Sequence, residues 1–89
     1  MFFVYIIRNN SNKLYIGISK NPISRLNSHN TKTGAEFTKS GRYNIVFQEE
    51  YKNLKEARQR EIQIKKWRRE KKNVLIKRYL SGLPTNLAR

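Results

Sequence analysis

The sequence predicts one small α+β domain, in which a three-stranded, mostly antiparallel sheet is flanked by helices in the order β-β-α-β-α-α. The chain has 89 residues, of which 37% are hydrophobic, enough for a single modest core. Short runs of β-branched and aromatic residues alternate with longer segments of helical periodicity. Asparagine stands at the start of two of these helical segments, where it favours helix initiation. We therefore expect residues 1–89 to form a single domain around one core.

Three segments have the composition of strands. Residues 2–8 and 13–19 are apolar, β-branched and aromatic runs, and the polar residues between them include Asn and Ser, which tolerate positive φ. These two segments predict a hairpin with Tyr5 on one strand and Tyr15 on the other. Residues 43–49 have the pattern of a third strand.

The first helix is expected to begin at Asn21-Pro22, since Asn is a good N-cap and Pro suits the first turn. It carries Arg25 and His29 and should stop within residues 30–34. Residues 31–43 have the composition of an exposed loop.

A second, long helix should start after Asn53, which is followed three residues later by Glu56 in the manner of a capping box. We expect it to run to about Lys72, with a break near Arg69, and to bury Leu54, Ala57 and Ile64 on one face. A last helix over residues 74–80 should end at Ser81-Gly82, since Pro84 prevents its continuation.

Charge is the strongest compositional feature. Twenty Lys and Arg residues against six Asp and Glu give a net charge of +14, which attracts polyanions and releases their counterions. Nucleic acid is the expected partner. A solvated basic face and an anionic membrane surface are the alternatives, but the basic region lacks the clean apolar stripe of a membrane-surface helix. The basic residues that follow the long helix's apolar face, Lys65, Lys66, Arg68 and Arg69, are the candidate nucleic-acid contacts.

Several features are absent from the sequence. Without cysteine, the chain has no disulfide and no thiolate metal site. No apolar run approaches the ~18 residues of a membrane span, so we expect no membrane association. The apolar start of the chain lacks a basic leader and a cleavage site, so it is read as a strand and not as a signal peptide. A cytoplasmic location is the expectation that follows.

Glu61 is out of place on its helix. At about 100° per residue it projects between Leu54 and Ala57, within the apolar stripe. A carboxylate on a core face is costly unless it is paired or binds a metal. Glu61 therefore either pairs with an arginine or faces a cleft and holds a cation. The ordinary alternative is an i,i+4 ion pair with Lys65.

Arg25 and His29 are four residues apart, so they share one face of the first helix. Arg presents a rigid fork that matches a phosphate, and His exchanges protons near neutral pH. A lone histidine is more often a surface or capping residue, and Arg25 could equally be one of many diffuse basic residues. Trp67 is expected to anchor the core beneath the basic helix, with base stacking as the alternative.

Taken together, these residues resemble the GIY-YIG nuclease superfamily, and in particular its small, single-domain, YhbQ-like branch. The resemblance covers about residues 2–79, and it rests on the order and spacing of several motifs. These motifs are Val4-Tyr5, Tyr15-Ile16-Gly17 and the stretches 25–29, 34–38, 56–61 and 64–67.

The resemblance implies a metal-dependent DNA endonuclease with catalytic residues Tyr5, Tyr15, Gly17, Arg25, His29 and Glu61. Glu61 would be the only protein ligand of one Mg²⁺ or Mn²⁺, an ion that commonly keeps several waters. Arg25 would hold the phosphate, either tyrosine would position the attacking water and accept its proton, and His29 would assist. Gly17 would let the strand pass close to the phosphate.

Two readings of the function remain. The first is a nuclease that cleaves structured or damaged DNA in repair or recombination, with a protein partner that directs it. The second is a non-catalytic nucleic-acid-binding module that retains the fold. Both tyrosines could also be ordinary amphipathic core residues.

Overall fold

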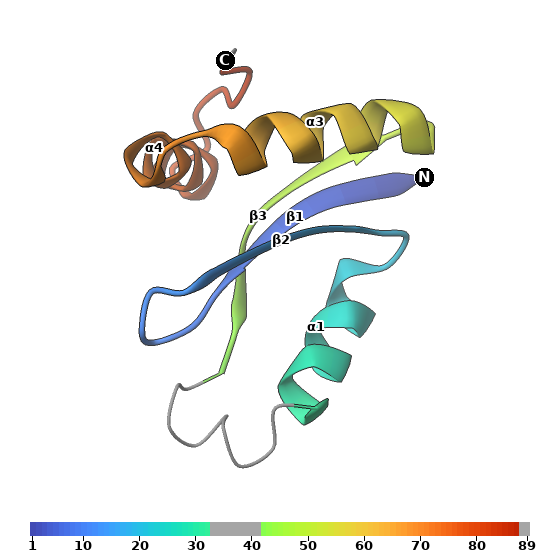
Figure 1. Ribbon diagram of the computed structural model, residues 1–89, viewed down its shortest axis with the longest axis vertical. Helices are drawn as coiled ribbons and strands as arrows, with labels where there is room; N and C mark the ends of the chain where they lie inside the picture. Colours follow the sequence, from blue (N-terminus) through green and yellow to red (C-terminus); the bar gives the residue numbers. More distant parts are fainter. Residues whose placement is uncertain (33–41, 88–89) are drawn as a thin grey trace.

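The computed structural model describes residues 1–32 and 42–87, apart from the side chains of residues 29, 31 and 32. The elements follow the predicted order β-β-α-β-α-α (Figure 1). Two strands, β1 (Phe2–Arg8) and β2 (Leu14–Ser19), precede helix α1 (Pro22–Lys32). Strand β3 (Asn44–Tyr51) follows, and then helices α3 (Leu54–Lys66) and α4 (Arg69–Leu80).

The three strands form one antiparallel sheet in the order β2-β1-β3, so β1 is central. Tyr5 lies opposite Gly17 on β2, and Ile7 lies opposite Tyr15. The pairing of β1 with β3 shifts between Ile6 and Ile7, which indicates a β-bulge. The predicted α+β architecture is therefore confirmed.

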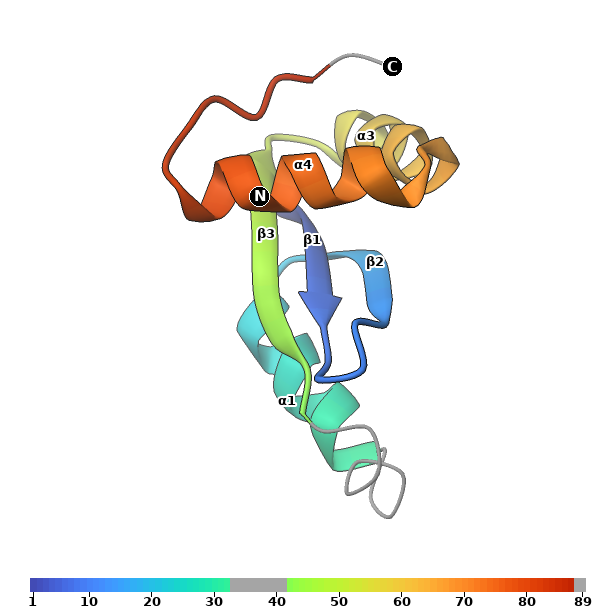
Figure 2. The ribbon, with the colours of Figure 1, turned by 90° about the vertical axis from the view of Figure 1, so that its left-hand side faces the viewer.

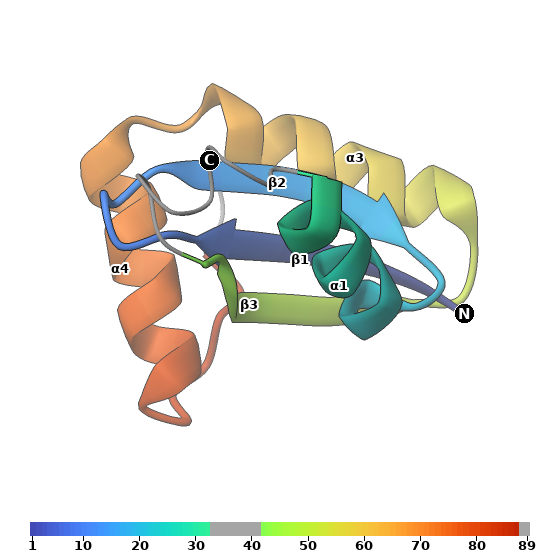
Figure 3. The ribbon, with the colours of Figure 1, turned by 90° about the horizontal axis from the view of Figure 1, so that it is seen from below.

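Helices cover both faces of the sheet. Figure 1 and Figure 3 show α1 on one face and α3 and α4 on the other, and in Figure 2 α4 crosses the strands. Successive residues of a strand point to opposite faces. The even-numbered residues of β1 therefore enter the main core with α3 and α4, whereas Tyr5 and Ile7 point to the face of α1. This core consists of Val4, Ile6, Ile16, Val46, Phe47, Ala57, Ile64, Trp67, Leu75 and Ile76.

Local side-chain caps fix the ends of the elements. The Asn21 side chain accepts a bond from the Ser24 amide at 3.1 Å, and Asn53 and Glu56 form the predicted reciprocal capping box at 2.9 Å in each direction. In the hairpin turn, Asn12 has a φ of 62°. Asn30, which is 7% exposed, donates to and accepts from the backbone of Tyr43, and so ties the end of α1 to the approach of β3.

The break expected near Arg69 is confirmed, since α3 ends at Lys66 and α4 begins at Arg69. Two other predictions about the long helix are wrong. It ends at Lys66 and not near Lys72, because Trp67 turns into an extended conformation while its N–H still bonds the Ile64 carbonyl at 3.1 Å. The turn buries Trp67 to 9% exposure, as expected for a core anchor. Leu54 was expected in the core but is 43% exposed, because it is the first residue of α3 and lies beyond the edge of the packed face.

A charged network holds the C-terminal tail against β3 and α3. The Arg60 Nε lies 3.0 Å from a Glu49 oxygen, and both side chains are mostly buried. The Arg60 guanidinium also donates to the carbonyls of Thr85 at 2.7 Å and Leu87 at 2.8 Å. Glu49 accepts bonds from the hydroxyls of Tyr51 and Thr85, each at 2.9 Å. Because each of these groups forms hydrogen bonds with several of the others, removing one member leaves other polar groups of the network without partners.

None of the helices in residues 1–32 and 42–87 has the length and apolar character that crossing a membrane requires.

Arg60→Met should be strongly destabilising, because it leaves the Glu49 carboxylate in a buried site without its cation. We expect a loss of about 3 kcal/mol or more in the free energy of unfolding, measured by urea denaturation. Arg58→Met is the matched control, since Arg58 is exposed on the same helix, and it should change stability by less than about 0.5 kcal/mol. Equal losses for the two variants would contradict this role for Arg60.

Burial and the hydrogen bond to Glu49 raise the pKa of Tyr51 from its ordinary value of 10.0 to about 12. Folded protein thus holds this proton more tightly than the unfolded chain does. The resulting stabilisation is complete below the ordinary pKa and is lost as the pH rises towards the folded value. Between about pH 10 and about pH 12, the free energy of unfolding should fall more steeply for the wild type than for Tyr51→Phe. Parallel curves would exclude the contribution of Tyr51.

Candidate active site

The absence of a side chain at Gly17 creates the space that Tyr5 occupies. A Cβ placed on Gly17 would lie 2.8 Å from the Tyr5 hydroxyl oxygen and 3.2 Å from the Tyr15 ring. Gly17 faces Tyr5 across the ladder, so the Tyr5 ring extends over β2 towards the edge of the sheet. The sequence-based expectation was that Gly17 gives room to a phosphate. In the structure, the group that needs this room is Tyr5.

Tyr5 links three of the predicted site residues. The Arg25 guanidinium on α1 donates a hydrogen bond to its hydroxyl oxygen, and the charges of Tyr15 and Glu61 also act on it. Burial raises the pKa of Tyr5 above its ordinary value of 10.0, and the bond from Arg25 opposes this shift without cancelling it. Tyr5 is 2% exposed and therefore neutral at physiological pH.

Tyr15 differs from Tyr5 in its access to solvent. The two rings are tilted by 42° with their centroids 6.3 Å apart, so the predicted tyrosine pair is present. However, Tyr15 is 41% exposed. Of the two phenols, Tyr15 is the one that water or a ligand can reach.

Glu61 extends from α3 towards the same edge. Its side chain is 13% exposed, and one carboxylate oxygen lies 3.2 Å from the Lys65 ammonium in an i,i+4 ion pair. The i,i+4 ion pair with Lys65, expected as the ordinary alternative, is therefore confirmed, whereas a cation held by Glu61 in a cleft stays a prediction. Glu61 pairs with Lys65, and its charge also reaches the cluster around Tyr5.

The donor set suits a metal that needs few protein ligands. Within residues 1–32 and 42–87, apart from the side chains not described, no three His, Cys, Asp or Glu residues come together as a metal site. Zinc, which usually takes four protein ligands or three with a water, does not fit these residues. Glu61 already holds the ammonium of Lys65, so its carboxylate is anionic and open to a cation. One such carboxylate fits Mg²⁺ or Mn²⁺ with a largely aqueous shell.

His29 lies within α1, four residues after Arg25, but its side chain is outside the described part of the structure. The same holds for the predicted motif at residues 34–38 and for most of the predicted loop at 31–43. The roles expected for these residues stay predictions.

The four predicted nucleic-acid contacts differ in their surroundings. Lys65 is paired with Glu61, and Lys66 is exposed on the outer side of α3. Arg68 is exposed at the N-cap of α4. The Arg69 guanidinium donates to the carbonyl of Asn12 and, at 3.2 Å, to Asn73, so it joins the hairpin turn to α4. Part of this basic group thus has a structural role.

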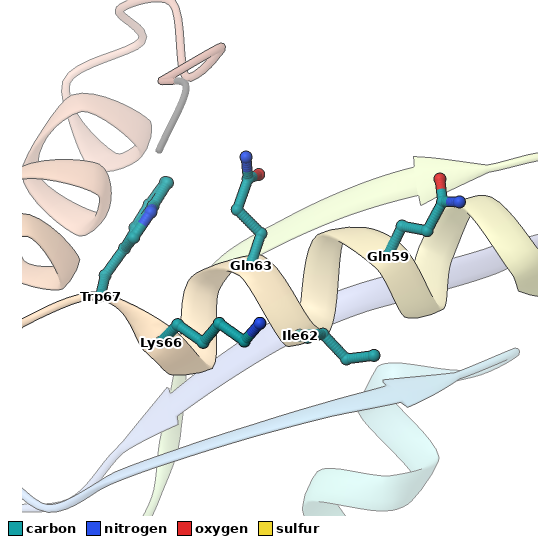
Figure 4. Close-up of a pocket in the computed structure, with 5 residues that line it drawn as sticks. All are labelled: Gln59, Ile62, Gln63, Lys66 and Trp67. Carbon is teal, nitrogen blue, oxygen red and sulfur yellow. The ribbon is translucent and has the colours of Figure 1, made fainter.

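A shallow pocket of about 510 Å³ lies beside these residues (Figure 4). Its lining comes from α3 and the residue that follows: Gln59, Ile62, Gln63, Lys66 and Trp67. None of the predicted catalytic residues lines this pocket. The catalytic candidates on the described strands and helices therefore lie outside this pocket.

Sequence reasoning missed the roles of Arg60 and Asn30. Arg60 lies beside the apolar face of α3 and seven residues before Trp67, whose ring its guanidinium carbon approaches at 5.3 Å. The seven-residue spacing between Arg60 and Trp67 in the sequence could have distinguished Arg60 from the arginines that face solvent. Nothing in the sequence near Asn30 points to its partner, the backbone of Tyr43 thirteen residues later.

The fold and the residues at the sheet edge define a GIY-YIG nuclease domain. The sequence model of the GIY-YIG catalytic domain matches residues 1–73, so the chain belongs to this family.

Its relatives carry the family name UPF0213, the YhbQ-like group. UPF0213 proteins from Staphylococcus aureus strains Mu50 and COL are each 42% identical to the chain over 76 residues, or 84% of this chain and 93% of theirs. The solution NMR structure of the UPF0213 protein BH0048 from Bacillus halodurans is 28% identical, with a TM-score of 0.58. That match covers 94% of this chain and 89% of the other.

Gly17→Ala should destabilise the protein by about 1–3 kcal/mol, because the new methyl group overlaps Tyr5. Tyr5→Phe removes the nearest atom, so it should recover part of this loss in the Gly17→Ala background. The ring carbon at 3.0 Å should keep the recovery incomplete. A double-mutant cycle by urea denaturation measures the coupling. Simple additivity of the two changes would mean that Tyr5 does not occupy the space over Gly17.

Proposed function

We propose that this protein is a metal-dependent endonuclease that hydrolyses phosphodiester bonds in DNA, with Mg²⁺ or Mn²⁺ as its cofactor. One observation carries most of the weight: a guanidinium, two phenols and a carboxylate from three different parts of the fold act on one another around Tyr5. Sequence-distant groups of these types at one sheet edge are what phosphodiester hydrolysis needs. Membership of a nuclease family supports the same conclusion.

In this mechanism Arg25 binds the phosphate that is attacked. Its guanidinium has five N–H donors in a planar fork, so it can keep its bond to Tyr5 and still donate to phosphate oxygens. These bonds strengthen as negative charge develops in the transition state. Tyr5, buried and neutral, acts as a positioning residue that fixes the guanidinium.

Tyr15 is the better candidate for handling the attacking water, because it is 41% exposed whereas Tyr5 is 2% exposed. As the water oxygen bonds to phosphorus, its proton passes to the Tyr15 oxygen. The bond between phosphorus and the leaving oxygen then breaks, and the leaving oxygen takes up a proton. His29, four residues after Arg25 in the sequence of α1, would assist in these proton transfers.

Glu61 would hold the divalent cation. When bound, Mg²⁺ or Mn²⁺ supplies positive charge that stabilises the phosphate and the leaving oxygen. In this mechanism Tyr15 takes part as a phenolate, so that its oxygen can accept the proton of the attacking water.

The substrate class follows from charge and from the size of the domain. The +14 surface and the exposed Lys66 and Arg68 favour a nucleic-acid backbone. A domain of this size has little room for elements that read base sequence. We therefore propose cleavage of structured or damaged DNA in repair or recombination in the cytoplasm, with a protein partner that supplies targeting.

The alternative is a nucleic-acid-binding module without catalysis. The Lys65 ammonium on the Glu61 carboxylate favours this alternative, since it occupies the group that would hold the metal. It accounts for the charge but not for the grouping of Tyr5, Tyr15, Arg25 and Glu61.

The test is a cleavage assay on supercoiled, branched and single-stranded DNA with Mg²⁺ or Mn²⁺. We expect wild type to nick at least one substrate, and Glu61→Gln and Arg25→Ala to lose about 10²-fold or more in rate. Tyr15→Phe should lose more activity than Tyr5→Phe, because it removes the atom that accepts the proton.

DNA binding by fluorescence anisotropy is the control for these variants. Binding should persist in Glu61→Gln, since removing a negative charge does not weaken attraction to a polyanion. Equal cleavage by wild type and Glu61→Gln would point to a contaminating nuclease and exclude the catalytic reading. Binding without cleavage by wild type on every substrate would favour the binding module.

A further inference from the structure

The carboxylate that would hold the metal is already in contact with a cation from its own helix. The Lys65 ammonium lies 3.2 Å from a Glu61 oxygen, in a pair whose two members differ in exposure. The Glu61 side chain is 13% exposed, whereas the Lys65 side chain is 52% exposed. The anion is therefore fixed in the site, and the cation reaches it from solvent.

Neighbouring cations are committed elsewhere. Arg60 is bonded to Glu49 and to the tail, on the other side of α3 from Lys65. Arg25 donates to Tyr5. Lys65 is thus the basic group whose contact with Glu61 can change without breaking the core network or the tyrosine cluster.

We propose that Lys65 is an exchangeable counter-ion: it neutralises Glu61 in the metal-free protein, leaves when a divalent cation binds, and then binds a backbone phosphate of the DNA substrate. This proposal rests on the proposed function, since it takes Glu61 as the metal ligand.

The exchange is physically easy. A Lys–Glu pair at i,i+4 contributes little to helix stability, so a divalent ion displaces the ammonium at small cost. The flexible four-carbon stem of lysine lets its charge move by several ångströms while the helix stays in place. Without either cation, the mostly buried Glu61 carboxylate would lack a partner, which is unfavourable. Lys65 therefore gives the Glu61 carboxylate a partner until metal binds.

The exchange also makes metal binding and DNA binding cooperative. In the metal-free protein the charges of Lys65 and Glu61 cancel, so Lys65 attracts phosphate weakly. With metal on Glu61, the Lys65 charge is released and the site becomes net positive. Each ligand then raises the affinity for the other, as linkage requires.

Lys66 provides the matched control. It is the next residue, it is exposed, and its charge is the same, but it lines the outer pocket of α3 and not the contact with Glu61. Lys65→Met and Lys66→Met remove one positive charge each, so a difference between them reports the contact and not the net charge.

The first measurement is Mn²⁺ affinity without DNA, by electron paramagnetic resonance of the free ion. Lys65→Met should bind Mn²⁺ about threefold to tenfold more tightly than wild type, because the competing ammonium is gone. Lys66→Met should change the affinity by less than about twofold, since its charge acts from a more distant, screened position. Glu61→Gln should lose the site.

The second measurement is the affinity for a short DNA duplex, in EDTA and in Mn²⁺, with Tyr15→Phe present in every protein to prevent cleavage. Lys65→Met should weaken binding in Mn²⁺ and have little effect in EDTA, where Lys65 is held by Glu61. Lys66→Met should change the DNA affinity by the same factor in EDTA and in Mn²⁺.

Equal effects of Lys65→Met and Lys66→Met on Mn²⁺ affinity, with the site lost in Glu61→Gln, would overturn the counter-ion role and leave the proposed metal site intact. A Lys65→Met effect on DNA affinity that is the same in EDTA and in Mn²⁺ would also overturn it. Mn²⁺ binding that is identical in wild type and Glu61→Gln would remove the proposed metal site, and the counter-ion role with it.

Discussion

The central position of β1 governs the rest of the structure. Both neighbours of β1 are hydrogen-bonded strands and helices cover both faces of the sheet, so the side chains of residues 4–7 in its middle are buried. The Tyr5 side chain has room in one direction, across β2, because Gly17 has no side chain there. The site therefore lies at the β2 edge, within reach of α1 and α3. A single missing methyl group determines where the phenols, the guanidinium of Arg25 and the carboxylate of Glu61 meet.

Electrostatics in this fold depends on a small number of anions in a highly basic chain. Glu49 and Glu61 are both mostly buried and both paired, but with cations of different kinds. Glu49 is bound by the planar fork of Arg60, which also holds backbone carbonyls, so that pair is structural. Glu61 is bound by Lys65, a flexible side chain that is 52% exposed. The Arg60–Glu49 pair stabilises the fold, whereas the Lys65–Glu61 pair leaves the Glu61 carboxylate available to another cation.

Most of the fold could be predicted from the sequence because its signals are local. Asn21, Asn53 and Glu56 cap helices through bonds to residues three positions away, and the strands follow from short apolar runs. The errors arise where tertiary packing overrides periodicity. Burial of Trp67 ends α3 before the apolar pattern does, and the position of Leu54 at the first turn leaves it exposed. The candidate site residues were chosen by family resemblance, and their geometry was not predictable from the sequence. Nothing local to Gly17 indicates that Tyr5, twelve residues earlier, lies over it, or that Tyr5 and Tyr15 differ so widely in exposure.

The hydrogen bonds of Arg60 to the C-terminal tail show where the boundary of this domain lies. The family match ends at residue 73, which falls inside α4, yet the acceptors of the Arg60 guanidinium include the carbonyls of Thr85 and Leu87. A recombinant fragment cut at the edge of the match would divide a helix that carries the core residues Leu75 and Ile76. It would also leave a mostly buried arginine with unbonded donors. The smallest unit that folds as this structure does therefore extends to residue 87, and protein engineering should attach fusion partners beyond that point.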